Sequence, residues 1–235
     1  MQEIVYQGNE LQLFQHATVW KNYFGSFIKP YLKGNILEVG AGIGSTTLQL
    51  CDGSQTEWIC LEPDPVLFSQ LEKNISTGTL PSCCNAIKGV ITDLSPEKKF
   101  NAVIYIDVIE HIENDVAELR RVQDYLAPGG YLIILVPAHQ FVYNQFDKSI
   151  GHYRRYNKKM LRKAVPQSLQ LKRIIYLDSV GLLASIANKY SLKQNYPTMK
   201  QISFWDKVMV RISKFTDFLI NYQTGKSLIA IWQKP

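Results

Sequence analysis

The sequence of 235 residues lacks the features of several special classes of protein. No stretch approaches the roughly 20 consecutive apolar residues that a membrane-spanning helix needs. The first ten residues contain no basic segment followed by an apolar run, so we expect no secretory signal and a cytoplasmic protein. Internal repeats and low-complexity linkers are also missing. With 46% hydrophobic and 20% charged residues, the sequence predicts one globular domain over residues 1–235.

Cysteine is scarce and is not arranged for a structural role. Four cysteines without a signal peptide do not make a disulfide framework in a chain of this length. They also lack the paired CxxC spacing of a structural zinc site. We therefore expect small buried or incidental surface thiols, and the sequence predicts no metal site. The four residues are Cys51, Cys60, Cys83 and Cys84.

Charge is divided unevenly between two parts of the chain. Residues 1–137 contain 9 Lys+Arg and 16 Asp+Glu, a net charge of −7. Residues 138–235 contain 17 and 4, a net charge of +13. Because a basic surface raises the local concentration of anions, the second part indicates an anionic partner. A solvated lysine-rich surface without a partner is the alternative.

Short apolar runs alternate with helical patterns through the first 137 residues. The runs cover 35–39, 57–61, 86–90, 102–106 and 131–136, and the helical patterns cover 45–51, 65–74 and 114–126. An amphipathic helix over 11–31 precedes them. This alternation predicts βαβ units and therefore an α/β fold with a doubly wound sheet and helices on both faces.

The alternation fails after Pro137. A polar and aromatic stretch over 139–156 leads to a basic helix at 158–165, a strand at 169–177 and a helix at 180–190. Residues 227–233 predict a last strand that joins the sheet. A further helix over 203–222 has an apolar stripe. We expect this stripe to pack on the domain; the alternatives are that it contacts a second subunit or lipid. The stripe consists of Phe204, Trp205, Val208, Met209, Ile212, Phe215 and Leu219.

A glycine-rich stretch after the first predicted strand carries the strongest chemical signal. Residues 36–47 read ILEVGAGIGSTT, so Gly40, Gly42 and Gly44 connect a strand to a helix. Glycine lets the backbone approach a ligand, and the helix start offers free N–H groups. A dinucleotide fingerprint GxGxxG from Gly40 would need a third glycine at position 45, which is Ser45.

Glu38 completes the pattern ExGxGxG, which resembles motif I of the class I S-adenosylmethionine-dependent methyltransferases. Further segments match that family in order: LEPD at 61–64, Asp93-Leu94, YIDVIEHI at 105–112 and LAPGGY at 126–131. The resemblance covers roughly residues 35–137. It implies a Rossmann-like, seven-stranded, mostly parallel sheet whose last strand is antiparallel. It also implies a helical cap at 1–34, a cofactor-binding half at 35–137, and an acceptor-side elaboration with the closing strand at 138–235.

The resemblance also implies a set of residues that bind S-adenosylmethionine. Glu62 would hold both ribose hydroxyls, since one carboxylate accepts two hydrogen bonds from a cis-diol. Asp93 and Leu94 would contact the adenine, and Asp107 would act through its main chain. The full set is Glu38, Gly40, Ala41, Gly42, Gly44, Glu62, Asp93, Leu94 and Asp107.

Candidate acceptor-side residues fall into two groups. His111 lies just past the fourth predicted strand, where it would serve as a general base or only pack beside the cofactor, and Glu110 is interpreted as structural. The stretch 139–156 resembles a run in bacterial members of this superfamily, and it offers an acid, a titratable base and an anion clamp. His152 is a second candidate base, Asp147 would orient one of the two histidines, and Arg154 and Arg155 would alternatively pin a loop. The predicted substrate-binding residues are Tyr143, Arg154, Arg155 and Tyr156.

These observations predict a methyltransferase that uses S-adenosylmethionine and releases S-adenosylhomocysteine. The acceptor would be a small molecule, a glycan or a lipid intermediate, and the basic second part indicates that it is anionic. Peripheral membrane contact fits the basic region, whereas no recognised RNA-binding motif occurs and no NPPY-type tetrad of nucleic-acid methylases follows the fourth strand. The alternatives are a non-enzymatic module that binds membranes or RNA, and aminopropyl transfer on the same fold.

Overall fold

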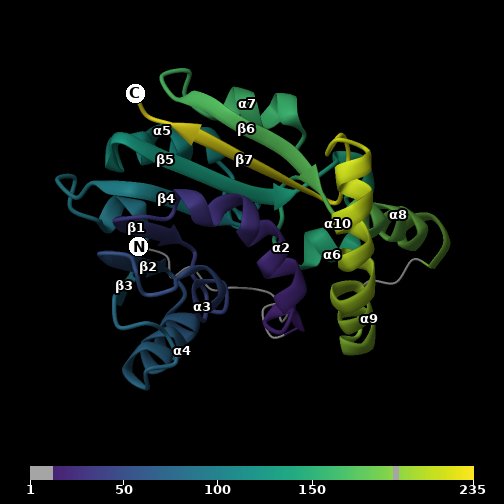
Figure 1. Cartoon of the computed structure of the whole chain (residues 1–235), viewed down its shortest axis with the longest axis horizontal. Coiled ribbons are helices and arrows are strands. Elements are labelled where there is room, and N and C mark those ends of the chain that lie inside the picture. The colour runs from purple at the N-terminus through teal and green to yellow at the C-terminus, as the bar shows by residue number, and fades with distance from the viewer. Residues whose placement is uncertain (1–12, 193–195) are drawn as a thin grey trace.

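The fold is a seven-stranded sheet covered by helices on both faces, seen in a computed structural model that describes residues 13–192 and 196–235 (Figure 1). The strands are β1 (Asn35–Val39), β2 (Glu57–Glu62), β3 (Cys84–Lys88), β4 (Phe100–Ile106), β5 (Leu126–Pro137), β6 (Gln170–Leu177) and β7 (Ser227–Gln233). Their order across the sheet is β3-β2-β1-β4-β5-β7-β6. The first five strands pair in parallel, and β7 lies antiparallel between β5 and β6. The predicted doubly wound sheet with an antiparallel last strand is therefore confirmed.

The helices divide between the two faces of the sheet. They are α2 (Thr18–Ile28), α3 (Thr47–Leu50), α4 (Pro65–Ser76), α5 (Asp115–Tyr125), α6 (Gln145–Ser149), α7 (Lys158–Ala164), α8 (Ser179–Ala187), α9 (Met199–Phe204) and α10 (Val210–Leu219). One core cluster packs α5 and α7 against the sheet, and the other packs α2, α3 and the α9–α10 region against the opposite face. Part of the predicted first helix, residues 11 and 12, lies outside the described residues. The strand expected at 86–90 begins two residues earlier, at Cys84.

Buried carboxylates attach the C-terminal helices to the rest of the domain. Asp206 accepts hydrogen bonds from the N–H groups of Val19 and Trp20 at the start of α2. Asp217 accepts from the Tyr23 hydroxyl at 2.9 Å, and Asp178 accepts from the indole of Trp205 at 2.7 Å. With Asp147, these residues are all four acids of residues 138–235, and each is at most 2% exposed. The outer surface of this part of the chain therefore presents lysine and arginine without a compensating carboxylate.

The apolar stripe of the last long helix does not pack on the domain as expected. Trp205 is buried and Met209 is half-buried. The other members of the stripe point outward: Phe204 is 58% exposed, Val208 40%, Ile212 48%, Phe215 64% and Leu219 63%. The prediction of core packing was wrong for these five positions, because the polar anchors Asp206, Ser213 and Asp217 turn the opposite face of the helix inward.

Candidate active site

The glycine loop after β1 forms one wall of a cavity of about 930 Å³ at the carboxyl ends of the strands. Gly40 has φ +69° and Gly42 has φ +57°, conformations that L side chains rarely adopt. A Cβ on Gly40 would lie 2.7 Å from the side chain of Val108, so the loop can pass close to β4 only without a side chain there. The lining includes Gly40, Ala41 and Gly42, together with Ser45 and Thr46.

Gly44 has a different reason to be glycine. Its φ is +82°, and a Cβ there would lie 2.7 Å from Leu80 and 3.0 Å from Leu71. Gly44 is absent from the described cavity wall. The third glycine of the pattern thus serves the packing of α4 and the segment after it against the loop.

Glu62, at the end of β2, faces the cavity with its carboxylate held from two sides. One oxygen accepts from the N–H of Gly42 at 2.7 Å, and the other accepts from the N–H of Asp64 at 2.9 Å. The residue is 4% exposed, and burial raises its pKa while the two backbone hydrogen bonds oppose the rise. Each carboxylate oxygen keeps a lone pair for a further donor, as a ribose diol requires.

The variant Glu62→Gln is expected to weaken binding of S-adenosylhomocysteine by about 1–3 kcal/mol, the scale of a hydrogen bond to a charged group. The amide loses the charge and one of the two acceptors. Isothermal titration measures the change, with Glu57→Gln at the half-buried start of the same strand as the matched control. Equal affinity in the two variants would mean that the ribose is bound elsewhere.

Glu38 and Lys21 are two buried titratable residues near the glycine loop. Glu38 accepts from Thr47 at 2.7 Å and from the indole of Trp58 at 2.9 Å; burial raises its pKa to about 7, and these hydrogen bonds oppose the rise. Lys21, from α2, donates to the hydroxyl of Ser45 at 2.9 Å. Burial lowers the pKa of Lys21 to about 8. Sequence reasoning missed Lys21, because its place on an amphipathic helix gave no sign that it lines the cavity.

Asp93 and Leu94 are not among the described residues of the cavity wall. Asp93 caps a short turn by accepting from the N–H of Val90 at 2.8 Å. The wall in this region is formed by Gly89, Val90 and Ile91. The assignment of Asp93 and Leu94 to the adenine therefore stays a prediction. The main chain at 89–91 lies closer to the cavity and is better placed to contact an adenine there.

Acidic residues and histidines gather on the opposite wall, after β4 and around α6. Asp107, with φ +54°, turns the chain out of β4, and Glu110 and His111 follow in a 3₁₀ turn. His152 Nδ1 lies 2.9 Å from an oxygen of Asp147, and His152 Nε2 lies 3.9 Å from Glu110. The sequence analysis predicted that Asp147 orients one of the two histidines. The structure places Asp147 beside His152 rather than His111.

Glu110 is a buried acid whose two carboxylate oxygens have no hydrogen-bond partner among the described residues. Burial, reinforced by Asp107, raises its pKa well above the usual range. Burial also raises the pKa of Asp107 to about 6, although His152, Lys226 and Arg155 oppose the rise. An acid so placed on a cavity wall is a candidate for contact with a ligand, and the interpretation of Glu110 as structural stays a prediction.

The two histidines lie edge to face, with ring centroids 4.5 Å apart. Burial, with a smaller contribution from His152, lowers the pKa of His111 to about 3, so this imidazole is neutral. Burial opposes ionisation of Asp147, but His152 and Arg155 outweigh it and lower its pKa. Asp147 therefore holds Nδ1 of His152, and Nε2 of the same ring faces Glu110.

Only one of the four predicted substrate-binding residues lines the cavity. Arg155 does so, and its Nε and Nη2 donate to Asp147 at 2.7 and 2.9 Å. Tyr143 donates to the carbonyl of His152, and Tyr156 is buried and donates to Asp115 at 2.6 Å. Arg154 donates to the carbonyls of Ile112 and Glu113 and pairs with Asp115, as a loop-pinning residue would. In this structure Tyr143, Arg154 and Tyr156 support the loop rather than face the ligand space.

We expect Arg154→Gln to lower the free energy of unfolding by about 1–2 kcal/mol without changing affinity for S-adenosylhomocysteine. The change removes a mostly buried ion pair and two charge-assisted hydrogen bonds, one of them to the carbonyl of Ile112 in the cavity wall. These partners lie outside the glycine loop, and none of them is Glu62. Urea denaturation measures the stability, and Arg162→Gln on the exposed face of α7 is the control. Weakened ligand binding with unchanged stability would return Arg154 to the site.

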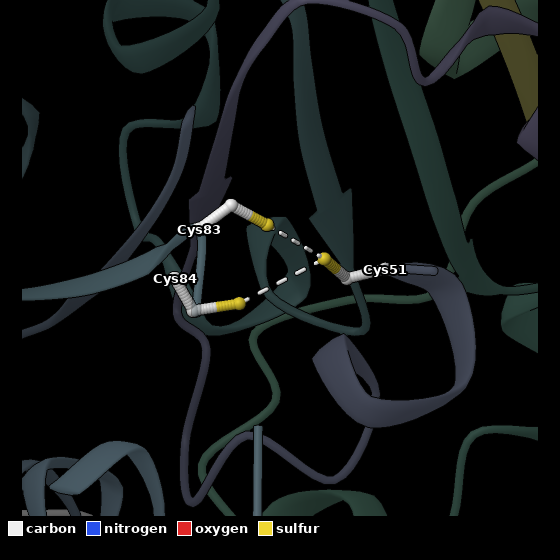
Figure 2. Close-up of side chains that lie close together, drawn as sticks. All are labelled: Cys51, Cys83 and Cys84. Carbon is white, nitrogen blue, oxygen red and sulfur yellow. Dashed lines mark hydrogen bonds between the residues drawn. The ribbon is translucent and has the colours of Figure 1, made fainter. Parts of the chain in front are cut away.

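The cysteines form a separate group away from these walls (Figure 2). Cys51 Sγ lies 3.5 Å from Cys83 Sγ and 3.8 Å from Cys84 Sγ, and all four cysteines are free. Burial and the contact with Cys51 raise the pKa of Cys83. Neutral thiols packed against one another fit the predicted role as small buried side chains, with Cys83 half-buried.

Comparisons with known proteins agree with the sheet and the glycine loop. A family model described as a methyltransferase domain matches residues 20–177. A curated relative, tRNA U34 carboxymethyltransferase of Shewanella frigidimarina, is 25% identical over 111 residues, which cover 46% of this chain. This chain matches only 33% of the length of that relative.

Solved structures extend the likeness to nearly the whole chain. A SAM-dependent methyltransferase from Archaeoglobus fulgidus has a TM-score of 0.61 at 16% identity, covering 96% of this chain and 97% of its own. The N-methyltransferase NodS from Bradyrhizobium japonicum, in complex with S-adenosyl-L-homocysteine, has a TM-score of 0.57 at 11% identity, covering 94% and 88%. At these identities the likeness is one of fold, and function rests on the site.

Proposed function

Because the chain belongs to the methyltransferase domain family, we propose that it transfers a methyl group from S-adenosylmethionine to an oxygen of an anionic acceptor. The acceptor class is a small molecule, a glycan or a lipid intermediate. One observation carries the proposal: a single cavity joins the glycine loop and Glu62 to two histidines and to a buried acid that has no hydrogen-bond partner within 13–192 and 196–235. The first wall suits an adenosyl cofactor, and the second suits a hydroxyl that must lose a proton.

The reaction is an in-line displacement in which the sulfonium supplies the reactivity. The C–O bond forms as the S–C bond breaks, and S-adenosylhomocysteine leaves as a neutral thioether. The protein holds the acceptor oxygen against the methyl group and excludes water. The proton of the acceptor hydroxyl leaves at the cluster formed by Glu110, His111 and His152, whose geometry Asp147 supports.

The preference for an anionic acceptor rests on cations in the cavity wall. Arg155 lines the cavity, and its Nη1 is buried without a hydrogen-bond partner among the described residues. Lys226, which precedes β7, lines the same wall; burial lowers its pKa, and Asp178 opposes the decrease. Sequence reasoning did not single out Lys226.

Lys21 supplies a cation at the cofactor end, where we propose that it pairs with the carboxylate of the methionine part of the cofactor. The variant Lys21→Met is expected to weaken S-adenosylhomocysteine binding by roughly tenfold, about 1.4 kcal/mol, because a partly buried ion pair is lost. Titration calorimetry measures the loss, and Lys33→Met, exposed before β1, is the control. Binding of adenosine would be unchanged in Lys21→Met; an equal loss for adenosine would refute the pairing.

The proposal as a whole is tested with methyl-labelled S-adenosylmethionine and three cell fractions: lipids, soluble glycans with small molecules, and RNA. We expect calorimetric binding of S-adenosylhomocysteine and label in an O-methyl product of one of the first two fractions. Failure to bind S-adenosylhomocysteine would refute the cofactor assignment. Label on nitrogen or carbon would refute the oxygen acceptor, and label in RNA would assign the protein to nucleic-acid modification, as in its curated relative.

A further inference from the structure

The acceptor end of the cavity contains a set of metal-binding side chains. The ligand atoms of Glu110, His111 and His152 all lie within 4.8 Å of one another. His152 Nε2 lies 3.9 Å from Glu110 Oε1. Three ligands that each lie about 2.1 Å from one tetrahedral ion are about 3.4 Å apart, so the three side chains reach a coordination geometry by moving inward by about 1 Å or less.

The surroundings of the three side chains also fit a cation. Glu110 is fully buried and both its oxygens lack a hydrogen-bond partner among the described residues, which is a costly state for an acid without a ligand. Asp147 holds His152 Nδ1 at 2.9 Å, and such an outer carboxylate is the usual partner of a metal-binding histidine. Asp107 lines the same wall and adds negative charge.

We propose that Glu110, His111 and His152 bind a divalent transition-metal ion that receives the acceptor oxygen. One carboxylate and two imidazoles suit Mn²⁺, Fe²⁺, Co²⁺ or Zn²⁺ better than Mg²⁺. Three protein ligands leave positions open for the acceptor hydroxyl, whose proton is lost to water on coordination. The resulting oxygen attacks the methyl group, and S-adenosylhomocysteine leaves. This inference rests on the proposed methyl transfer and specifies how the acceptor is activated.

The test uses the untagged full chain, saturated with S-adenosylhomocysteine and titrated with Co²⁺ under visible absorption. We expect one ion per chain with the spectrum of nitrogen and oxygen ligands. The variants Glu110→Gln and His152→Gln should bind at least tenfold more weakly, whereas the exposed His16→Gln should match the unmodified chain. Equal binding by all variants would overturn the site, as would sulfur-ligand absorption, which would place the ion at Cys51, Cys83 and Cys84.

Chelation separates this inference from the proposed function. We expect methyl transfer to stop after exhaustive chelation and to return with Mn²⁺ or Co²⁺. A chelated protein that binds S-adenosylhomocysteine and still methylates its acceptor would refute the metal site and leave the methyltransferase proposal standing. Loss of S-adenosylhomocysteine binding in the untreated protein would refute the proposed function itself.

A second, independent observation is an amphipathic outer surface on residues 199–219. The exposed apolar side chains Phe204, Val208, Ile212, Phe215 and Leu219 follow helical spacing, and Phe218 beside them is 67% exposed. Exposed basic residues flank this stripe: Lys200, Lys207, Arg211 and Lys214. Figure 1 shows α9 and α10, in yellow, end to end beside α8. No described helix is both long and apolar enough to cross a bilayer.

We infer that this surface lies on an anionic lipid bilayer. A helix with an apolar face beside a basic face binds in the headgroup plane of such membranes. Every acid of residues 138–235 is buried, so no carboxylate on this part of the chain opposes anionic headgroups. The surface also adjoins the cavities: Trp205 lines the central cavity, and Phe204 and Trp205 line a second one beside it. An acceptor carried by a lipid would thus reach the site from the membrane.

Vesicle co-sedimentation tests the surface. We expect binding to vesicles of 30% phosphatidylglycerol in phosphatidylcholine, and at least tenfold less binding to phosphatidylcholine alone. The double variant F215S/L219S should lose binding at least tenfold, whereas Phe141→Ser, which removes an exposed apolar side chain elsewhere, should bind normally. Equal binding by both variants would refute the surface. A dimer detected by sedimentation velocity and abolished by F215S/L219S, without vesicle binding, would assign the face to a second copy of the chain.

Discussion

Replacement of His152 by glutamine is expected to reduce methyl transfer by about 10²- to 10⁴-fold while leaving the affinity for S-adenosylhomocysteine unchanged. Glutamine keeps a polar side chain, but it lacks the imidazole nitrogens, one of which is held by Asp147 while the other faces Glu110. The ring belongs to the acceptor wall, so the glycine loop and Glu62 are untouched. The measurement is the initial rate of label transfer to the acceptor fraction, with titration calorimetry on the same preparation.

His16→Gln is the matched control for this effect, since His16 is exposed and is not among the residues that line the cavity. A rate in His152→Gln within a factor of three of the control would exclude His152 from the chemistry. Loss of cofactor binding in His152→Gln would show that the ring supports the cavity rather than the transfer.

Gly42→Val is expected to abolish binding of S-adenosylmethionine while the domain stays folded. Gly42 lines the cavity at φ +57°, and its N–H holds the carboxylate of Glu62. A branched side chain would occupy the ligand space and force the backbone out of this conformation, at a cost of about 1–2 kcal/mol. Titration calorimetry measures the binding, and circular dichroism with thermal unfolding measures the fold.

Gly78→Val separates backbone strain from exclusion of the ligand. Gly78 has φ +72° with no atom near its added Cβ, so the substitution imposes similar strain far from the cavity. We expect a similar loss of stability with full cofactor binding. Retained titration heat in a folded Gly42→Val protein would contradict the assignment of the glycine loop to the cofactor.

The sequence predicted the glycine loop and Glu62 as neighbours in one site because their signals are local. The strand, the glycines and Glu62 lie within 28 residues. Gly40 and Gly42 have positive φ values, which glycine adopts more easily than other residues. The central strands of the sheet could be predicted because strands buried on both faces appear in the sequence as short apolar runs. The two-residue error at β3 occurs in an edge strand in which Cys84 alone is fully buried.

The acceptor wall could not be read in the same way, because its residues come from separate segments. Glu110 follows β4, His152 follows α6, and Lys226 precedes β7; the order of strands in the sheet brings them together. Arg154 and Arg155 are neighbours in sequence but diverge, one to the carbonyls after β4 and the other to Asp147. The apolar stripe over residues 204–219 was wrongly predicted to pack on the domain. Apolar periodicity shows that a helix has two faces, but it does not show that buried polar side chains hold the opposite face against the rest of the domain.

The π-helical turn η6 (Trp205–Met209) between α9 and α10 sets the phase of these two helices relative to each other. Such a turn contains one residue more than a regular helix would need. Trp205 and Asp206 fix the first part to Asp178 and α2, and Ser213 and Asp217 fix the second part to Asp178 and Tyr23. Deleting one residue would rotate one set of anchors by about 100° relative to the other. The number of residues in this turn therefore determines which face of α10 packs against the rest of the molecule and which face is exposed.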